Sequence, residues 1–321
     1  MSRILITGAT GFIGKRLLQK LSDRKYLVDI IVRDLMKLPG AEFYNNYFFL
    51  DDIDSVTDWK PILCKNDIII HLSARVHIMN DKAKNPLFEF RKANVESTLN
   101  FARQAAIIGV KRFIFLSSIK VNGESTIAGQ LFTEKDIPKP IDAYGISKFE
   151  TEKGLFLISD ELGMDVVCIR PPLVYGPGVK ANFLNMIRWL YRGFPLPLGA
   201  IHNKRSLVAL DNLVDLIMVC IDHPRAANQV FIAGDGEDLS TSELLRRVCI
   251  EMGKPVRLFS INQKLLESSL NMLNRSGLAQ RLCGSLQVDI SKAKTFLNWT
   301  PVVTVEQGLH KTVQHFIETE T

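Results

Sequence analysis

The chain has 321 residues, of which 46% are hydrophobic, enough for a large buried core in one or two domains. Its net charge of +6 comes from scattered basic residues without an arginine–aromatic array, which argues against nucleic-acid binding and suits a cleft for an anionic substrate. The five cysteines form no C-x-x-C pair, so we expect reduced thiols. No apolar run approaches ~18 residues, so we expect no membrane insertion. The chain opens on an apolar strand rather than a signal peptide, and we therefore expect a cytoplasmic protein.

A glycine-rich turn follows the first expected strand. The apolar residues 4–6 lead into the run Gly8-Ala9-Thr10-Gly11-Phe12-Ile13-Gly14, after which an amphipathic helix begins. Glycine at positions 8 and 11 lets a pyrophosphate approach the backbone, Gly14 lets the helix pack closely on the strand, and the helix amino terminus offers free N–H groups. A tight turn without a ligand is the alternative. The flanking strand and helix favour a dinucleotide site, with contacts from Gly8, Thr10, Gly11, Phe12, Ile13 and Gly14.

Short runs rich in Ile, Val and Phe recur along the first half and alternate with helix-length segments. Strands are expected at residues 27–32, 47–50, 67–72, 112–117 and 165–170, with a last strand at 231–233. The helices between them include residues 88–108 and 144–162. This alternation predicts an α/β fold, a doubly wound parallel sheet with helices on both faces.

After residue 170 the chain becomes rich in proline and glycine, and helices are expected at residues 183–191, 242–252 and 263–273. They predict a smaller lid that binds the substrate, while residues 207–222 return to the main body. We therefore expect a dinucleotide-binding domain of residues 1–174 and 207–235. A discontinuous substrate domain is expected mainly from residues 175–206 and 236–321.

A tyrosine and a lysine four residues apart mark the expected catalytic helix. Tyr144 and Lys148 share one helix face, so the ammonium can lower the pKa of the phenol and grip a ribose hydroxyl. Such a phenol moves a proton on a hydroxyl or carbonyl oxygen. Alone, this spacing is common and is more typical of a solvated helix face. Here it follows Ser118, which a central strand carries to the ligand-binding edge of the sheet, and the three residues together predict catalysis.

With these motifs in order, the chain resembles the extended short-chain dehydrogenases/reductases. Within that family it is similar to the UDP-glucose and UDP-N-acetylglucosamine 4-epimerases and to related sugar-nucleotide 4-keto-reductases. The matching segments cover nearly the whole chain: residues 7–14, His71-Leu72-Ser73-Ala74-Arg75, Asn94, Ser117-Ser118, Tyr144 with Lys148, Arg170-Pro171-Pro172, Val174-Tyr175-Gly176-Pro177-Gly178, Asn182-Phe183, Arg205-Ser206-Leu207-Val208 and Leu297-Asn298-Trp299-Thr300-Pro301.

The resemblance implies a role for each matching residue. It makes Ser118, Tyr144 and Lys148 a catalytic triad. It implies further cofactor contacts at Asp52, Ile53, Leu72, Ser73, Ala74, Asn94, Ser117 and Pro171, besides Tyr144 and Lys148. It implies substrate contacts at Arg75, Ser118, Lys120, Asn182 and Arg205, although Lys120 and its neighbour Asn122 are equally well read as solvated loop residues. A homodimer built on residues 88–108 and 144–162 is a further implication.

Two residues after the second strand bear on the choice of cofactor. The family's NAD-binding epimerases carry an acidic residue there, whose carboxylate binds the ribose 2′-hydroxyl. This chain has Arg33 followed by Asp34. An arginine suits a 2′-phosphate, so Arg33 favours NADP(H), whereas a shift of one residue in the alignment lets Asp34 serve NAD.

Two further segments narrow the chemistry. Related 4,6-dehydratases carry an acidic pair just after the hydroxyl residue, but this chain has Ile119 and Lys120, which argues against loss of water. His71 and His77 have no third ligand nearby, so no metal site is expected.

These observations predict an NAD(P)-dependent enzyme that exchanges a hydride at C4 of a UDP-hexose. An epimerase returns the hydride to the other face of the 4-keto sugar. The alternative is an NADPH-dependent reductase of a UDP-4-keto-6-deoxy-hexosamine, which consumes its cofactor. A non-catalytic NADP-binding regulatory module is a second alternative, for which a broken Ser/Tyr/Lys set would be the sign.

Overall fold

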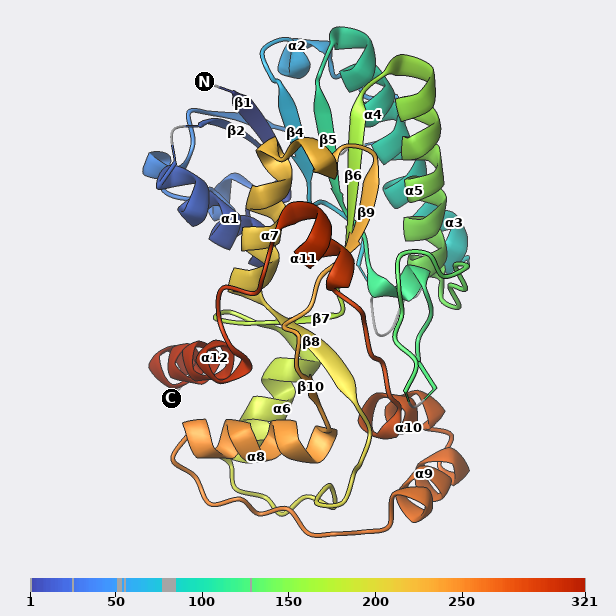
Figure 1. The fold of residues 1–321 in the computed structure, drawn as a ribbon. Coiled ribbons are helices and arrows are strands. Elements are labelled where there is room, and N and C mark those ends of the chain that lie inside the picture. Colours follow the sequence, from blue (N-terminus) through green and yellow to red (C-terminus); the bar gives the residue numbers. More distant parts are fainter. Residues whose placement is uncertain are drawn as a thin grey trace.

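Seven parallel strands form one twisted sheet in the upper half of the molecule, in the order β3-β2-β1-β4-β5-β6-β9 (Figure 1). This computed structural model describes residues 2–24, 26–50, 54, 56–76, 85–127 and 129–320. The strands are β1 (Arg3–Thr7), β2 (Leu27–Val32), β3 (Asn46–Phe49), β4 (Ile68–His71), β5 (Arg112–Leu116), β6 (Asp165–Arg170) and β9 (Gln229–Ile232). The strand order reverses between β1 and β4, which places a switch point at their carboxyl ends. The expected doubly wound parallel α/β fold is confirmed.

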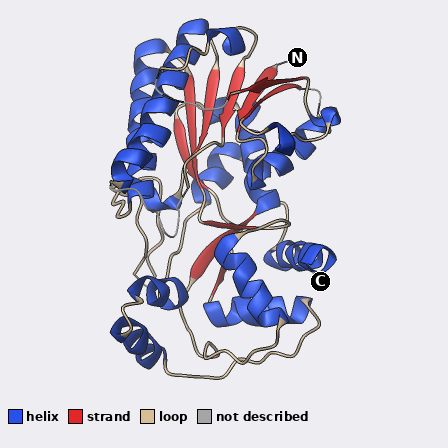
Figure 2. Cartoon of the chain, turned by 180° about the vertical axis from the view of Figure 1, so that it is seen from behind, coloured by secondary structure: helices blue, strands red, loops and turns tan. Residues whose placement is uncertain are grey.

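Helices cover both faces of this sheet, as Figures 1 and 2 show from opposite sides. Alternate side chains of β1 point to opposite faces, so Ile4 and Ile6 pack in one core and Leu5 packs in another. The first core is completed by α1 (Phe12–Ser22), α7 (Leu210–Asp222) and α11 (Ser291–Leu297). The second core is completed by α2 (Lys60–Leu63), α4 (Ser97–Ile108) and α5 (Ala143–Leu162).

The helix expected at residues 88–108 is divided into three parts. It begins as α3 (Pro86–Phe90), widens to a π-helix over η3 (Arg91–Glu96) and continues as α4. A π-helical turn is frequent at functional sites because it re-aims one side chain. Here the buried Asn94 lies within the π-helical turn, and its contacts are described below.

The lower half of the molecule has its own sheet and core. Strands β7 (Leu173–Tyr175), β8 (Arg205–Ala209) and β10 (Asp238–Leu239) pair in the order β10-β8-β7. The elements packed around this sheet are α6 (Ala181–Tyr191), α8 (Thr241–Glu251) and α12 (Val305–Glu320), with α9 (Gln263–Met272) and α10 (Ser276–Cys283) beyond them. The short 3₁₀ turns are η1 (Leu35–Lys37), η2 (Ala41–Phe43), η4 (Ile119–Val121) and η5 (Pro224–Ala226).

The chain crosses between the two halves repeatedly. Ala293 and Leu297 of α11 pack in the main core together with Trp299, whose Nε1 donates a hydrogen bond to Asp215 of α7 at 2.9 Å. The carboxyl-terminal lid segment therefore returns to the main body before α12 closes the lower core. The exact domain boundaries stay a prediction.

None of the helices in the part of the chain that the structure describes is both long and apolar enough to span a bilayer. All five cysteine thiols are free, and four of them are buried.

Candidate active site

The glycine turn at the end of β1 leaves no room for side chains. Gly8 has a φ of +71°, and a Cβ there would lie 2.9 Å from the Ser73 nitrogen. A Cβ on Gly14 would lie 2.2 Å from the Gly8 carbonyl oxygen. Gly11 is the N-cap of α1 and provides no side-chain cap, so the N–H groups of the first helical turn face an open approach. This geometry suits a bound pyrophosphate.

A buried hydroxyl at the end of β5, two strands away from β1 in the sheet, adds to this fit. The Ser117 Oγ atom, just beyond the end of β5, is buried and has no hydrogen-bond partner among the described residues. A buried polar atom of this kind is costly unless a ligand or water completes it. The open helix terminus and Ser117 therefore fit a dinucleotide lying across the strand ends. Two expected cofactor residues, Asp52 and Ile53, lie outside the described residues.

Arg33 and Asp34 lie together where the chain leaves β2. Arg33 is exposed. The Asp34 carboxylate lies 2.7 Å from Lys37 Nζ and accepts the Met36 N–H at 3.0 Å, and these hydrogen bonds, that of Lys37 first, hold its pKa below the usual range. Asp34 is thus a carboxylate held in place by local contacts just after the end of β2.

His71 ties the ends of β1 and β4 together. Its Nδ1 lies 2.9 Å from Thr7 Oγ1 and its Nε2 lies 3.1 Å from Thr98 Oγ1. Burial, assisted by the charge of Lys148, lowers the pKa of His71 to about 3, so the ring is neutral. His71 is therefore a buried core residue at the end of β4. The half-buried loop that follows contains Leu72, Ser73 and Ala74.

Asn94 fastens that loop to the helices behind it. Its Oδ1 accepts the Arg75 N–H at 2.7 Å, and its Nδ2 donates to the Arg75 carbonyl and to Ser147 Oγ, both at 3.0 Å. The Arg75 guanidinium lies over the Phe90 ring, 5.4 Å from its centroid. Phe90 in turn meets the edge of the Tyr144 ring at 6.2 Å. Arg75 is therefore linked to the expected acid/base Tyr144 through Phe90, and Asn94 is linked to the same helix through Ser147.

Ser118 and Tyr144 come together from β5 and α5. Ser118 follows the end of β5 and is a hydrogen-bond partner of the Tyr144 phenol. Tyr144 lies in the first turn of α5, where Asp142 is the N-cap and accepts the Gly145 N–H at 2.7 Å. Burial and the nearby Asp142 charge raise the pKa of Tyr144, and the Ser118 hydrogen bond opposes them. The sequence predicts a pKa of Tyr144 lowered by Lys148, and this is wrong for the structure, where burial is the largest influence and raises that pKa.

Lys148 lies one helical turn further along α5 and is buried. Its Nζ donates to the Leu116 carbonyl at 2.8 Å and lies 4.3 Å from the centroid of the Phe115 ring. Burial lowers the pKa of Lys148 to about 7, against the opposing charge of Glu152. The Nζ atom lies 5.8 Å from the centre of the Tyr144 ring, so the two groups are neighbours as the four-residue spacing predicts.

Lys120 holds the catalytic segments together rather than standing free for a sugar. Its ammonium forms an ion pair with Asp142 and lies 3.4 Å from Glu124 Oε1. Because Asp142 caps α5, this pair joins the turn that carries Ser118 to the start of the helix that carries Tyr144. Sequence reasoning missed Asp142, although an aspartate three residues before Gly145 is an ordinary N-cap signal.

A buried ion pair supports the same region. Arg170 at the end of β6 contacts Glu152 of α5 through Nε at 3.0 Å and through Nη2 at 2.5 Å. Its Nη1 donates to Asn122 Oδ1 at 2.9 Å, so Asn122 is also structural. Removing one member would leave a buried charge without a partner, which costs roughly 3–5 kcal/mol. The adjoining Pro171 accepts the Ile119 N–H at 3.0 Å through its carbonyl.

The lid contributes a half-buried cation. Arg205, at the start of β8, donates from Nη1 to the Gly284 carbonyl at 3.0 Å, and burial lowers its pKa. Within the described residues Arg205 has no carboxylate partner. A half-buried guanidinium of this kind suits a diphosphate. Asn182, in the first turn of α6, is exposed.

The parallel sheet, the glycine turn and the Ser–Tyr–Lys set define a dinucleotide-dependent oxidoreductase of the short-chain type. Residues 4–234 match the model of the NAD dependent epimerase/dehydratase family, and the chain belongs to that family.

Known proteins of similar sequence and structure agree with this assignment. A UDP-glucose 4-epimerase of Vibrio cholerae is 44% identical over 316 residues, which cover 98% of this chain and 95% of that protein. A Bacillus cereus UDP-glucuronic acid 4-epimerase in complex with NAD superposes with a TM-score of 0.79 at 21% identity, over 99% of this chain and 100% of that one. A Thermotoga maritima UDP-glucose 4-epimerase with UDP-glucose gives 0.77 at 24% identity, over 99% and 100%.

Tyr144→Phe tests the assignment of the acid/base. The change removes one hydroxyl and keeps the ring against Phe90, so folding and cofactor affinity should be nearly unchanged. Turnover should fall by at least ~10²-fold, since no other group takes up the proton. Steady-state kinetics and cofactor titration measure both quantities, and near-normal turnover would rule out the assignment.

Lys120→Met tests the link to Asp142. Loss of the ammonium leaves the Asp142 charge uncompensated, which raises the pKa of Tyr144 further. A base with a raised pKa is deprotonated only at higher pH, so the rising limb of the pH–rate profile should move up by roughly half a pH unit. Lys120→Arg should restore the profile, and Asp142→Asn, which keeps a helix cap, should move the limb down. A uniform loss of rate at every pH would instead indicate direct substrate contact.

Proposed function

We propose that this chain is a UDP-hexose 4-epimerase. The intact Ser118, Tyr144 and Lys148 set at the carboxyl end of the sheet carries this proposal, together with the open glycine turn beside it. The proposal is supported by the 44% identity to a UDP-glucose 4-epimerase over nearly the full length. An intact catalytic set also disfavours the regulatory module, because a sensor has no need of an acid/base.

The residues divide the chemistry in a simple way. Tyr144 takes the proton of the C4 hydroxyl as the carbonyl forms and returns it in the reverse step, while Ser118 holds the same oxygen. Lys148, buried against Phe115, positions the ribose and favours the ionised phenol. The chemistry that a bound nicotinamide supplies is acceptance and return of the hydride at C4.

The lid holds the substrate by its nucleotide end. We assign the diphosphate to the half-buried Arg205 and a neighbouring contact to Asn182. Anchoring the nucleotide alone leaves the hexose free to turn, so that the 4-keto sugar presents its other face. The two residues after Ser118 are not acidic, which argues against dehydration. Of these two, Ile119 is buried and Lys120 forms an ion pair with Asp142.

For the cofactor we propose NAD. The family is NAD dependent, whereas the preference for NADP(H) rests on Arg33 alone. Asp34 makes two local contacts, and a carboxylate has about four acceptor sites, which leaves room for ribose hydroxyls. Arg33 is exposed, and with NAD as the cofactor its side chain is solvated and has no phosphate to bind.

We further propose a cytoplasmic homodimer. The free thiols suit a reducing compartment. Exposed apolar side chains on the helices that the resemblance places at the interface support a dimer, namely Phe88, Ile107 and Leu157. Sedimentation of the purified chain measures the oligomeric state.

The epimerase proposal is tested by cofactor stoichiometry. Purified enzyme with only trace oxidised NAD is incubated with UDP-glucose, UDP-galactose and their N-acetyl forms, and the epimers are separated by chromatography. Because an epimerase regains its hydride, we expect interconversion of at least one pair without net cofactor consumption. Consumption of one NADPH per molecule of a UDP-4-keto-6-deoxy-hexosamine, with no epimer formed, would establish the reductase instead.

The cofactor proposal is tested by two neighbouring variants. NAD should bind the unmodified chain more tightly than NADP. Asp34→Asn should weaken NAD binding by ~10-fold, because a charged hydrogen bond is lost. Arg33→Ala should change the affinity for NAD little. Fluorescence titration measures all three. Tighter binding of NADP, selectively lost in Arg33→Ala, would restore the preference that the sequence suggests.

A further inference from the structure

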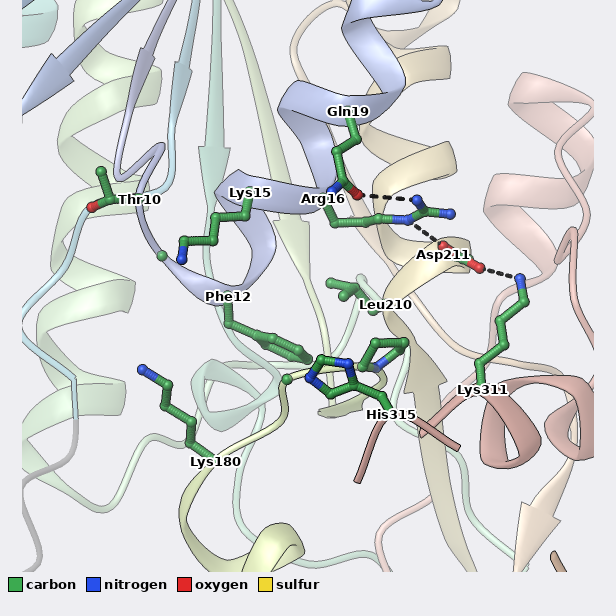
Figure 3. A pocket seen from close by; sticks show the side chains of 13 residues that line it. Thr10, Phe12, Lys15, Arg16, Gln19, Lys180, Leu210, Asp211, Lys311 and His315 are labelled. Carbon is green, nitrogen blue, oxygen red and sulfur yellow. Dashed lines mark hydrogen bonds and ion pairs between the residues drawn. The ribbon is translucent and has the colours of Figure 1, made fainter. Parts of the chain in front are cut away.

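A cavity of about 580 Å³ opens on the outer side of the glycine turn, where the two halves of the molecule meet (Figure 3). One wall is the solvent face of α1, with Phe12, Lys15, Arg16 and Gln19. The other wall comes from the lid: Pro177, Gly178 and Lys180 after β7, and Lys311 and His315 of α12. The volume is in the range of small-molecule sites.

The cavity is strongly cationic. Four cations and a single carboxylate line it, a net charge of +3 with His315 neutral. The carboxylate, Asp211, is paired with two of these cations: Arg16 Nε lies 2.6 Å from Oδ1 and Lys311 Nζ lies 2.5 Å from Oδ2. Burial alone would raise the pKa of Asp211, but these two hydrogen bonds bring it below its usual value.

The other two cations have no such partner. Lys15 and Lys180 form no ion pair with any residue that the structure describes, and they enter the cavity from its two walls (Figure 3). Both lysines are exposed, so their mutual repulsion is weak, and an anion placed between them would be attracted to both. Apolar surface lies beside them, from Phe12, Pro177 and Leu210. The lining therefore suits a small anion, with apolar surface available for a few carbon atoms of the same ligand.

This cavity is distinct from the expected cofactor cleft. Four expected cofactor residues do not line it: Leu72 just after β4, Asn94 in η3, Ser117 just after β5 and Lys148 in α5. The two sites share only Thr10, Gly11 and Phe12 of the turn. Phe12 packs against both the main core and the lid core, and it stands between the cavity and the rest of the molecule.

We propose that this cavity is a second anion-binding site, which takes a phosphate dianion between Lys15 and Lys180. The shared chemistry of its ligands is the phosphate group, supplied either as free phosphate or as the phosphate ester of a small sugar. Because one wall belongs to α1 and the other to α12 and the β7–α6 loop, an occupant joins the lid to the cofactor turn.

Calorimetric titration at low salt tests this site, with the protein saturated in both NAD and UDP so that its other anion sites are filled. Inorganic phosphate and glucose 6-phosphate are the two probes. We expect one site per chain for at least one probe, and the stronger of the two identifies the source. The double variant Lys15→Ala/Lys180→Ala should weaken binding by at least ~10-fold, through loss of two charge-assisted contacts.

Lys20→Ala is the matched control, because Lys20 is an exposed lysine of the same helix outside the cavity. It should leave the affinity unchanged, and both variants should keep the thermal stability of the unmodified chain. Absence of binding to both probes would overturn the proposal, as would equal affinity in the double variant. Binding that appears only when NAD is left out would also overturn it, since the site would then be part of the cofactor cleft.

Discussion

The contact between α1 and the turn before it constrains everything built around the cofactor site. The hydrogen atom of Gly14 occupies a place where a Cβ would stand 2.2 Å from the Gly8 carbonyl oxygen. Only with this contact does the first turn of α1 begin directly above the end of β1, with its N–H groups open. The position of α1 in turn sets one wall of the cationic cavity. A single close approach of backbone to backbone thus positions the open amino terminus of α1 and, beside it, one wall of the cationic cavity.

Precise placement of the catalytic groups depends on buried polar contacts rather than on apolar packing alone. His71 links β1, β4 and α4 through two threonines, and Asn94 links the loop after β4 to α5. Glu152 and Arg170 link α5 to β6. Hydrogen bonds specify angle and register, which apolar contacts leave loose. The cost is local: Lys148 is buried deeply enough to bring its pKa to about 7, an arrangement that suits chemistry more than stability.

The lid is joined to the main body at several points, although it has its own core. Phe12 packs against both cores, and Lys311 of α12 reaches Asp211 of α7. The return of α11 to the main sheet adds a further crossing. Within the lid, Arg205 is held through its hydrogen bond to the Gly284 carbonyl. These contacts fix the placement of the lid core relative to the glycine turn.

The sequence by itself determined the parallel sheet, the glycine turn and the Tyr144–Lys148 pair, because each depends on spacing along one strand or one helix. It also located Ser118 at a strand end, where an apolar run stops. The interruption of the helix at Asn94, the Lys120–Asp142 pair and the Arg170–Glu152–Asn122 group were decided only by the tertiary structure. So was the cationic cavity, whose lysines lie on α1, after β7 and on α12. Local patterns record which face of an element is apolar, whereas the partner of a charged side chain depends on which distant segment the fold brings within a few ångströms of it.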